Sequence, residues 1–252
     1  MTEPSFRTLC AAAYAWPFLR RVRVAILLLL PLGIAVLGAF PPRTVGRGTG
    51  GWAFGLAFLL ACSVSYLFAV LRRTTDPHPP TPETFGREVD PEDALPDFLG
   101  FLGALLVAYL PLGGLLVHAF FFAERPFGSW TAAAGVGTAG VAGTLYFPMT
   151  LLMMGVAGDW RAGFNLPLGL RTIGRLGGDY LLCAGAFLAA AGTIVVMELL
   201  AVPATEPRSW DRFLARTGAG VAEFYLAIVA MRVLGLLYVA RHERLGWAAR
   251  GT

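Results

Sequence analysis

The chain alternates between long apolar runs and shorter segments rich in Arg, Pro and Gly. About 20 consecutive apolar residues are needed for an α-helix to cross the hydrocarbon core of a bilayer. Six runs reach or approach this length, and each predicts a transmembrane helix. The first run is the shortest, and the fourth is rich in Gly and Ala. The six predicted spans are residues 24–40, 52–71, 98–122, 131–157, 180–202 and 218–240.

Two landmarks recur at a spacing of about eighty residues, as expected of an internal repeat. The Pro-Leu-Gly triplet at residues 31–33 returns at residues 111–113, and Tyr66 returns as Tyr146. The alternative is chance, because Leu, Gly and Tyr are common in membrane helices. We favour the repeat and expect an all-α integral membrane protein of about six transmembrane helices. These helices would form three helical hairpins, with amphipathic segments at the membrane interface.

The composition supports the same fold class. Hydrophobic residues make up 56% of the chain and charged residues 14%, whereas a soluble domain carries about 25% charged residues. A chain this apolar can satisfy its surface only where lipid is the solvent. All twenty basic residues are Arg, which we interpret as the codon bias of a GC-rich bacterial genome. They lie at the ends of the apolar runs, so we expect no nucleic-acid partner.

The distribution of Arg predicts the orientation of the chain. Basic residues gather in the cytoplasmic loops of membrane proteins. Thirteen Arg lie in the two termini and in the loops after the second and fourth spans, against six in the other loops. Both termini are therefore expected on the cytoplasmic side of a bacterial inner membrane, in a multi-pass protein.

The same pattern gives the organisation of the chain. Residues preceding the first span carry Tyr14, Trp16 and Phe18, which suit the membrane interface. The predicted segments are an N-terminal interfacial segment (1–23), helices one and two (24–71), an acidic Pro-rich cytoplasmic loop (72–97), helices three and four (98–157), an amphipathic elbow (158–179), helices five and six (180–240) and a cytoplasmic tail (241–252).

The loop at residues 74–97 is rich in Pro, Asp and Glu. This composition disfavours a packed core and favours an exposed cytoplasmic segment. The acidic side chains suit either a docking surface for a basic protein partner or a solvated linker.

The pattern of residues in the elbow predicts a short amphipathic helix. Asn165 can cap its start, and Pro167 suits its first turn. Arg171 and Arg175 lie four residues apart, on a different face from an apolar stripe of Leu and Ile. We expect this helix to lie in the cytoplasmic interface, where its Arg side chains reach the phosphates of membrane lipids.

A resemblance follows from these residues. Residues 165–171, then Gly178-Asp179-Tyr180-Leu181, are similar to the elbow of several bacterial multi-pass families described as domains of unknown function. They also resemble the membrane domain attached to some glycerophosphodiester phosphodiesterases. The ending at residues 232–247 looks like the closing helix of such proteins. The resemblance implies a membrane fold and no known reaction, because the catalytic phosphodiesterase domain is absent from this sequence.

Ionisable residues inside spans are candidates for a functional site because burying them in lipid is costly. With the orientation above, His118, Glu198 and Glu223 fall at similar depth in the outer halves of their helices. They are expected either to line one polar pocket or to reach interfacial water separately. Arg232 lies deeper, and we expect it either to tie its helix to a neighbour or to bind a substrate.

Small residues at intervals of four allow two helices to approach closely. Gly135, Ala139 and Gly143 follow this spacing in the fourth predicted span. The stripe predicts close packing within the bundle or, alternatively, a homo-oligomer interface.

The sequence carries no HExxH, GxSxG or phosphate-loop motif and no spacing typical of metal ligands. We therefore predict a protein that is not an enzyme and has no cofactor or metal. It would act as a scaffold, accessory subunit or assembly partner. The alternative is a small transporter or channel that uses His118, Glu198 and Glu223.

Overall fold

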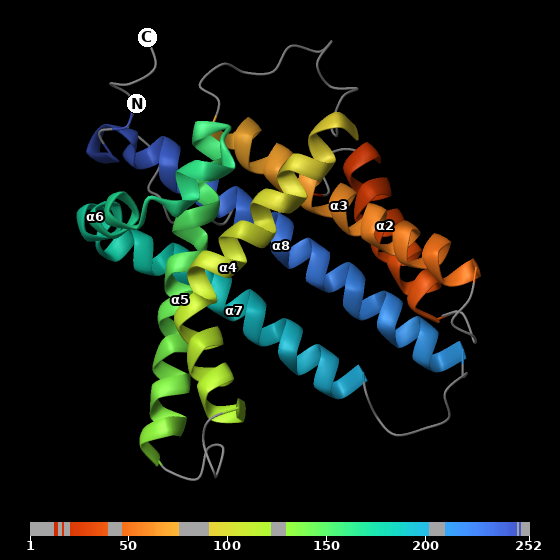
Figure 1. Ribbon diagram of the computed structural model, residues 1–252. Coiled ribbons are helices and arrows are strands. Elements are labelled where there is room, and N and C mark those ends of the chain that lie inside the picture. Colours follow the sequence, from red (N-terminus) through yellow and green to blue (C-terminus); the bar gives the residue numbers. More distant parts are fainter. Residues whose placement is uncertain are drawn as a thin grey trace. The chain divides into compact units, whose positions relative to one another are not determined.

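The computed structural model describes residues 13–14, 17, 21–39, 47–75, 91–121, 130–201, 210–245 and 247. Within these ranges every regular element is a helix (Figure 1), which confirms the predicted all-α class for this part of the chain. The helices are α2 (Arg21–Ala39), α3 (Arg47–Thr75), α4 (Pro91–Phe121), α5 (Trp130–Ala157), the 3-10 helix η3 (Trp160–Phe164), α6 (Leu166–Leu176), α7 (Gly178–Ala201) and α8 (Trp210–Leu245).

Four of these helices are long and apolar enough to cross a membrane. They include α5, so the Gly- and Ala-rich span meets the requirement. Helices α2 and α7 cover the first and fifth predicted spans, but their described apolar stretches are shorter, Arg23–Val36 and Gly178–Ala190. The four long stretches are Ala53–Thr75 in α3, Ala94–His118 in α4, Ala134–Ala157 in α5 and Thr217–Glu243 in α8.

Helix boundaries follow local chemistry. Pro91 is the first residue of α4, a position where the missing N–H costs nothing. Gly158 ends α5 with a φ of 65°, and Gly177 separates α6 from α7 with a φ of 54°. Each glycine N–H bonds back to a carbonyl of the preceding helix, that of Met154 or Ile173, at 3.0 Å. Left-handed φ values are easy for Gly and strained for other residues.

The acidic segment at residues 72–97 differs from the predicted loop at both ends. Helix α3 continues to Thr75 and α4 begins at Pro91, so only residues 76–90 of that loop lie outside the described residues. Asp97, expected on an exposed loop, is buried within α4. The reason is that Pro91 starts the helix early and Asp97 finds cationic and hydroxyl partners on α3.

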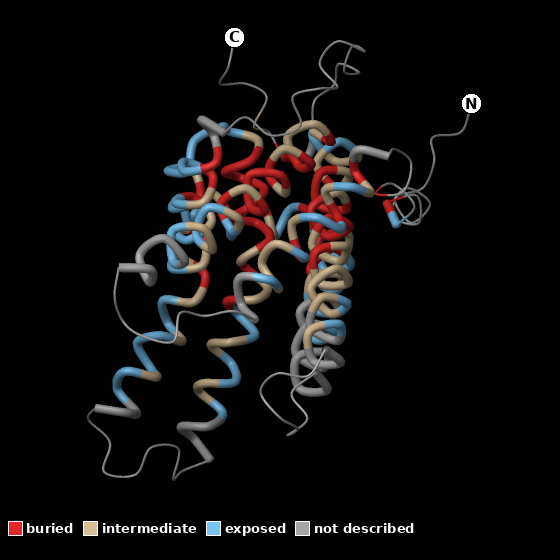
Figure 2. Tube along the Cα trace, turned by 90° about the vertical axis from the view of Figure 1, so that its right-hand side faces the viewer, coloured by how far each residue is buried: buried red, intermediate tan, exposed pale blue. Residues whose placement is uncertain are grey.

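The chain divides into two compact units, each made of two separate stretches of the sequence. Unit 1 comprises residues 1–98 and 189–240, and unit 2 comprises residues 99–188 and 241–252. Along the helices of both units, buried stretches alternate with exposed ones (Figure 2). Each helix therefore packs along only part of its surface, and the exposed remainder is largely apolar.

The core of unit 1 forms where α3 meets α8. The ring centroids of Tyr66 and Phe224 lie 6.0 Å apart. Further along the two helices, the backbone of Gly235 lies so close to Thr74 that a Cβ at residue 235 would lie 2.6 Å from the Cβ of Thr74. The buried residues of this core include Tyr66, Phe68, Val70, Leu71, Ile228, Leu234 and Leu237.

The core of unit 2 forms around the second half of α5. Pro148 lies inside that helix, and membrane helices tolerate such a residue when neighbouring groups satisfy the freed carbonyl. Tyr180 of α7 donates a hydrogen bond to the carbonyl of Leu145, which ties α7 to α5. The buried residues of this core include Met149, Leu151, Leu152, Met153, Met154, Tyr180 and Cys183.

Candidate functional site

One buried charged contact among the described residues starts from two side chains on α3. Ser65 and Arg72 are seven residues apart, which is about two helical turns, so both project from the same face. Arg72 also lies over the ring of Phe68, with its Cζ 5.8 Å from the ring centroid. The aromatic ring and the helix backbone thus limit the positions that the guanidinium can take.

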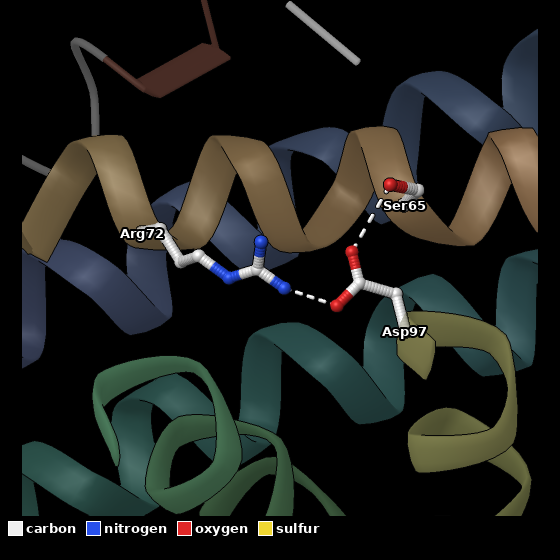
Figure 3. A network of polar contacts seen from close by, with 3 residues as sticks. All are labelled: Ser65, Arg72 and Asp97. Atoms are coloured by element: carbon white, nitrogen blue, oxygen red, sulfur yellow. Dashed lines mark hydrogen bonds and ion pairs between the residues drawn. The ribbon is translucent and has the colours of Figure 1, made fainter. Parts of the chain in front are cut away.

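Asp97 of α4 lies between these two side chains (Figure 3). The hydroxyl of Ser65 donates to Oδ2 of Asp97 at 3.0 Å. Arg72 donates from Nη2 to the other carboxylate oxygen, Oδ1, in an ion pair. Each oxygen of the carboxylate therefore accepts a hydrogen bond from a different turn of α3. We call these three residues the α3–α4 clasp.

Two of the three clasp residues are buried. Asp97 is 8% exposed and Ser65 2%, whereas the Arg72 side chain is 36% exposed. A buried carboxylate is costly unless it is paired and hydrogen-bonded, and both requirements are met here. The clasp joins α3 to α4, and its hydroxyl, guanidinium and carboxylate groups bond to one another. Sequence reasoning missed Ser65; its signal is the seven-residue interval to Arg72, followed by an acidic residue in the next helix.

Arg232 forms a second polar contact within unit 1. Its Nη1 donates to the hydroxyl oxygen of Thr74 at 3.3 Å, which links α8 to α3. That hydroxyl donates its own proton to the carbonyl of Val70 at 2.7 Å, so its lone pairs face the guanidinium. This geometry fits the expected tie between helices.

The structure does not place the three residues of the predicted polar pocket relative to one another. His118 is exposed near the end of α4 and belongs to unit 2. Glu223 is half-buried in α8 and belongs to unit 1. Glu198 lies in α7, and its side chain is outside the described residues. The pocket stays a prediction.

The elbow is built by two capping side chains. The Asp159 carboxylate accepts from the N–H of Arg161 at 2.9 Å and starts η3. The Asn165 side chain accepts from the N–H of Leu168 at 3.2 Å and starts α6, with Pro167 in the first turn. Asn165 thus caps the helix that the sequence assigns to it. Arg171 and Arg175 are both exposed.

Two polar contacts join the C-terminal end of the elbow to the end of α8 within unit 2. Arg175 donates from Nη1 to the carbonyl of Leu245 at 3.4 Å. Arg241 donates from Nε to Asp179 at 2.7 Å, and both side chains are partly exposed. Asp179 lies in the first turn of α7, where a negative charge is favoured by the helix dipole.

The small-residue stripe of α5 faces α4. A Cβ at Gly143 would lie 2.7 Å from both the carbonyl oxygen of Ala108 and a ring carbon of Tyr109. Next to it, the hydroxyls of Tyr109 and Thr144 share a hydrogen bond of 3.0 Å. A Cβ at Gly135 would meet Leu115 at 3.9 Å. Ala139 is half-buried, and the closest approach is therefore at Gly143.

A substitution at Gly169 tests how closely the elbow packs against α5. A Cβ there would lie 2.6 Å from the hydroxyl oxygen of Tyr146 and 3.1 Å from Met153. Gly169→Ala is expected to lower the free energy of unfolding by about 1–3 kcal/mol, because the ring or the elbow must move. The measurement is the midpoint of SDS-induced unfolding of the full chain in mixed micelles.

The control is Gly174→Ala on the same helix, where nothing lies within 4 Å. It should leave stability unchanged or raise it by up to about 1 kcal/mol, because Gly is unfavourable inside a helix. Equal losses in Gly169→Ala and Gly174→Ala would contradict the close approach to Tyr146.

These contacts define the class of protein. The described chain is all-helical, four of its helices are suited to crossing a membrane, and buried or partly buried polar contacts tie helices together within each unit. Comparison with protein-family models, with curated proteins and with solved structures gives no match. The resemblance of the elbow to bacterial multi-pass families therefore stays a prediction.

Proposed function

We propose that this chain is a non-enzymatic polytopic membrane protein that acts as a scaffold, accessory subunit or assembly partner. In this proposal α2 and α7 cross the membrane with the four longer helices, which makes six spans in three hairpins. The excess of Arg at the termini and in two of the loops supports cytoplasmic ends in a bacterial inner membrane.

The observation that carries this proposal is the exposed face of α4. In an 18-residue part of its apolar stretch only 17% of the residues are buried, against 61% in the corresponding part of α5. Leu99, Leu102 and Leu106 are all exposed and follow the spacing of three and four residues that packs one helix into another. Two turns further, Gly113 has nothing within 4 Å, so a partner helix can approach the backbone closely there.

The polar contacts support the same proposal. The carboxylate of Asp97 and the guanidinium of Arg232, both in apolar stretches, are engaged with side chains of α3. They join helices of one chain, as expected of a structural component. The free surface for a partner is then the apolar face of α4, where a second copy of the chain or another membrane protein can pack.

The test is the composition of the particle extracted from native membrane in polymer-bounded nanodiscs. The wild-type chain is expected to carry a stoichiometric partner, either another protein or a second copy. The variant Leu99→Ala/Leu102→Ala/Leu106→Ala should lose that partner. The matched control is Leu28→Ala/Leu29→Ala on an exposed part of α2, which should keep it.

Two results would contradict the proposal. One is a wild-type particle that holds a single copy of the chain and lipid alone. The other is solute or proton flux in proteoliposomes of the purified chain that Glu198→Gln or Glu223→Gln abolishes, since this would favour the transporter.

A further inference from the structure

The η3–α6 elbow presents three different surfaces. The residues of α6 that are buried are Gly169, Thr172 and Leu176. Leu166 and Leu170 are 44% and 55% exposed. At about 100° per residue, this exposed apolar side points about 110° away from the buried side.

Arg171 and Arg175 form the third surface of α6. Both are exposed, and they point about 140° away from the exposed leucines at about 100° per residue. A helix held against a protein on one side thus has an apolar side and a basic side on two separate faces. This is the arrangement of a helix that lies flat in a membrane interface, with its apolar side toward the acyl chains.

The residues before α6 add two partly exposed aromatic rings. Trp160 and Phe164 of η3 are 49% and 43% exposed, and their rings meet edge to face with centroids 5.5 Å apart. Arg161 lies over the Trp160 ring, with its Cζ 5.6 Å from the centroid. Aromatic rings next to a cation are typical of the level where acyl chains meet headgroups.

Position along the chain places this surface at the end of apolar helices. The apolar stretch of α5 ends at Ala157, and that of α7 begins at Gly178. Only residues 158–177 lie between the two stretches, and they include the whole elbow. The elbow therefore meets whatever surrounds the ends of these two helices.

The elbow is also fixed in orientation by two close approaches to α5. A Cβ at Gly163 would lie 2.8 Å from the sulfur of Met154 and 2.8 Å from Cγ2 of Thr150. A Cβ at Gly169 would lie 2.6 Å from the Tyr146 hydroxyl. Because a glycine of η3 and a glycine of α6 each pack closely against α5, neither helix can rotate to bury its exposed apolar side chains on α5.

We propose that the elbow is a binding surface for anionic phospholipid. Trp160, Phe164, Leu166 and Leu170 insert among the acyl chains. Arg161 and Arg171 bind the phosphates of the headgroups. Arg175 contributes less because it already donates to the Leu245 carbonyl. This inference is independent of the proposed scaffold role, since it needs only lipid.

The first experiment measures lipid binding by the full chain in zwitterionic micelles, using native mass spectrometry during titration with phosphatidylglycerol. Arg161→Gln/Arg171→Gln is expected to weaken binding about 25-fold, at about fivefold for each Arg near an anionic surface. Arg175→Gln, the matched control on the same helix, should change binding less than twofold. Phosphatidylcholine should bind the wild type and the double variant equally.

Two results of this titration would overturn the proposal. One is an unchanged affinity for phosphatidylglycerol in the double variant. The other is competition by inorganic phosphate at concentrations equal to those of the lipid, which would indicate a site for free phosphate instead of a lipid surface.

The second experiment distinguishes lipid from a protein partner and does not depend on charge. Leu170→Cys and Arg171→Cys are compared for labelling by a water-soluble maleimide in proteoliposomes that contain only this chain and lipid. Labelling is read above the background of the three native cysteines. Leu170→Cys should react at least tenfold more slowly than Arg171→Cys. Equal rates would mean that lipid does not cover the leucine side, and a protein partner would then be the better occupant.

Discussion

Asp97→Ala is expected to be among the most destabilising single substitutions in this chain. It removes both oxygens of the α3–α4 clasp and leaves Arg72 and Ser65 at a buried contact without their acceptor. Breaking a buried ion pair by removing one partner costs about 3–5 kcal/mol. Because the Arg72 side chain is 36% exposed and can turn toward solvent, we expect a loss of about 2–4 kcal/mol.

The measurement is the midpoint of SDS- or heat-induced unfolding of the full chain in micelles. Glu243→Gln, at an exposed position of α8, should change the free energy of unfolding by less than about 0.5 kcal/mol. Asp97→Ala/Arg72→Leu should recover part of the loss, because no uncompensated charge remains. If Asp97→Ala were as stable as Glu243→Gln, the clasp would contribute nothing to the free energy of unfolding.

The second large effect is expected at Gly143. In Gly143→Ala the new methyl group would lie 2.7 Å from the carbonyl oxygen of Ala108. A backbone atom in the middle of a helix cannot turn aside, so α4 and α5 must separate. Their separation also stretches the neighbouring hydrogen bond between Tyr109 and Thr144. We expect a loss of about 2–3 kcal/mol, at the upper end of the usual cost of overpacking.

Gly137→Ala is the matched control, because it lies on the same helix and nothing is within 4 Å of its Cβ position. It should be neutral or slightly stabilising. The measurement is again unfolding in micelles, with cross-linking between cysteines placed on α4 and α5 as a second readout of their separation. Equal stability of Gly143→Ala and Gly137→Ala would show that the two helices do not approach at residue 143.

The helical class, the position of most helices and the capped elbow were predictable because they depend on local patterns. Apolar length predicts α3, α4, α5 and α8. The cap at Asn165 needs only an amide side chain before a helix start. Each of these features is decided by residues close together in the sequence.

The clasp was not predictable in the same way. Asp97 ends a segment rich in Pro and acidic residues, and composition alone indicates an exposed loop. Its burial depends on Ser65 and Arg72, which lie 32 and 25 residues earlier in the chain. The same limit applies to Arg232, whose partner Thr74 is separated from it by 158 residues. The apolar stripe of the elbow was predictable. Its exposure was not, because it depends on the packing of Gly169 of α6 against Tyr146 of α5.

The separation between Thr74 and Arg232 has a consequence for synthesis. A ribosome adds about 5–20 residues per second, so Arg232 follows Thr74 into the translocation channel only after roughly 10–30 s. During this delay α3 is in the bilayer without its α8 neighbour. The hydroxyl proton of Thr74 is already donated to Val70 one turn back in the same helix. The nascent helix can therefore satisfy its own hydroxyl donor in lipid until the last span arrives.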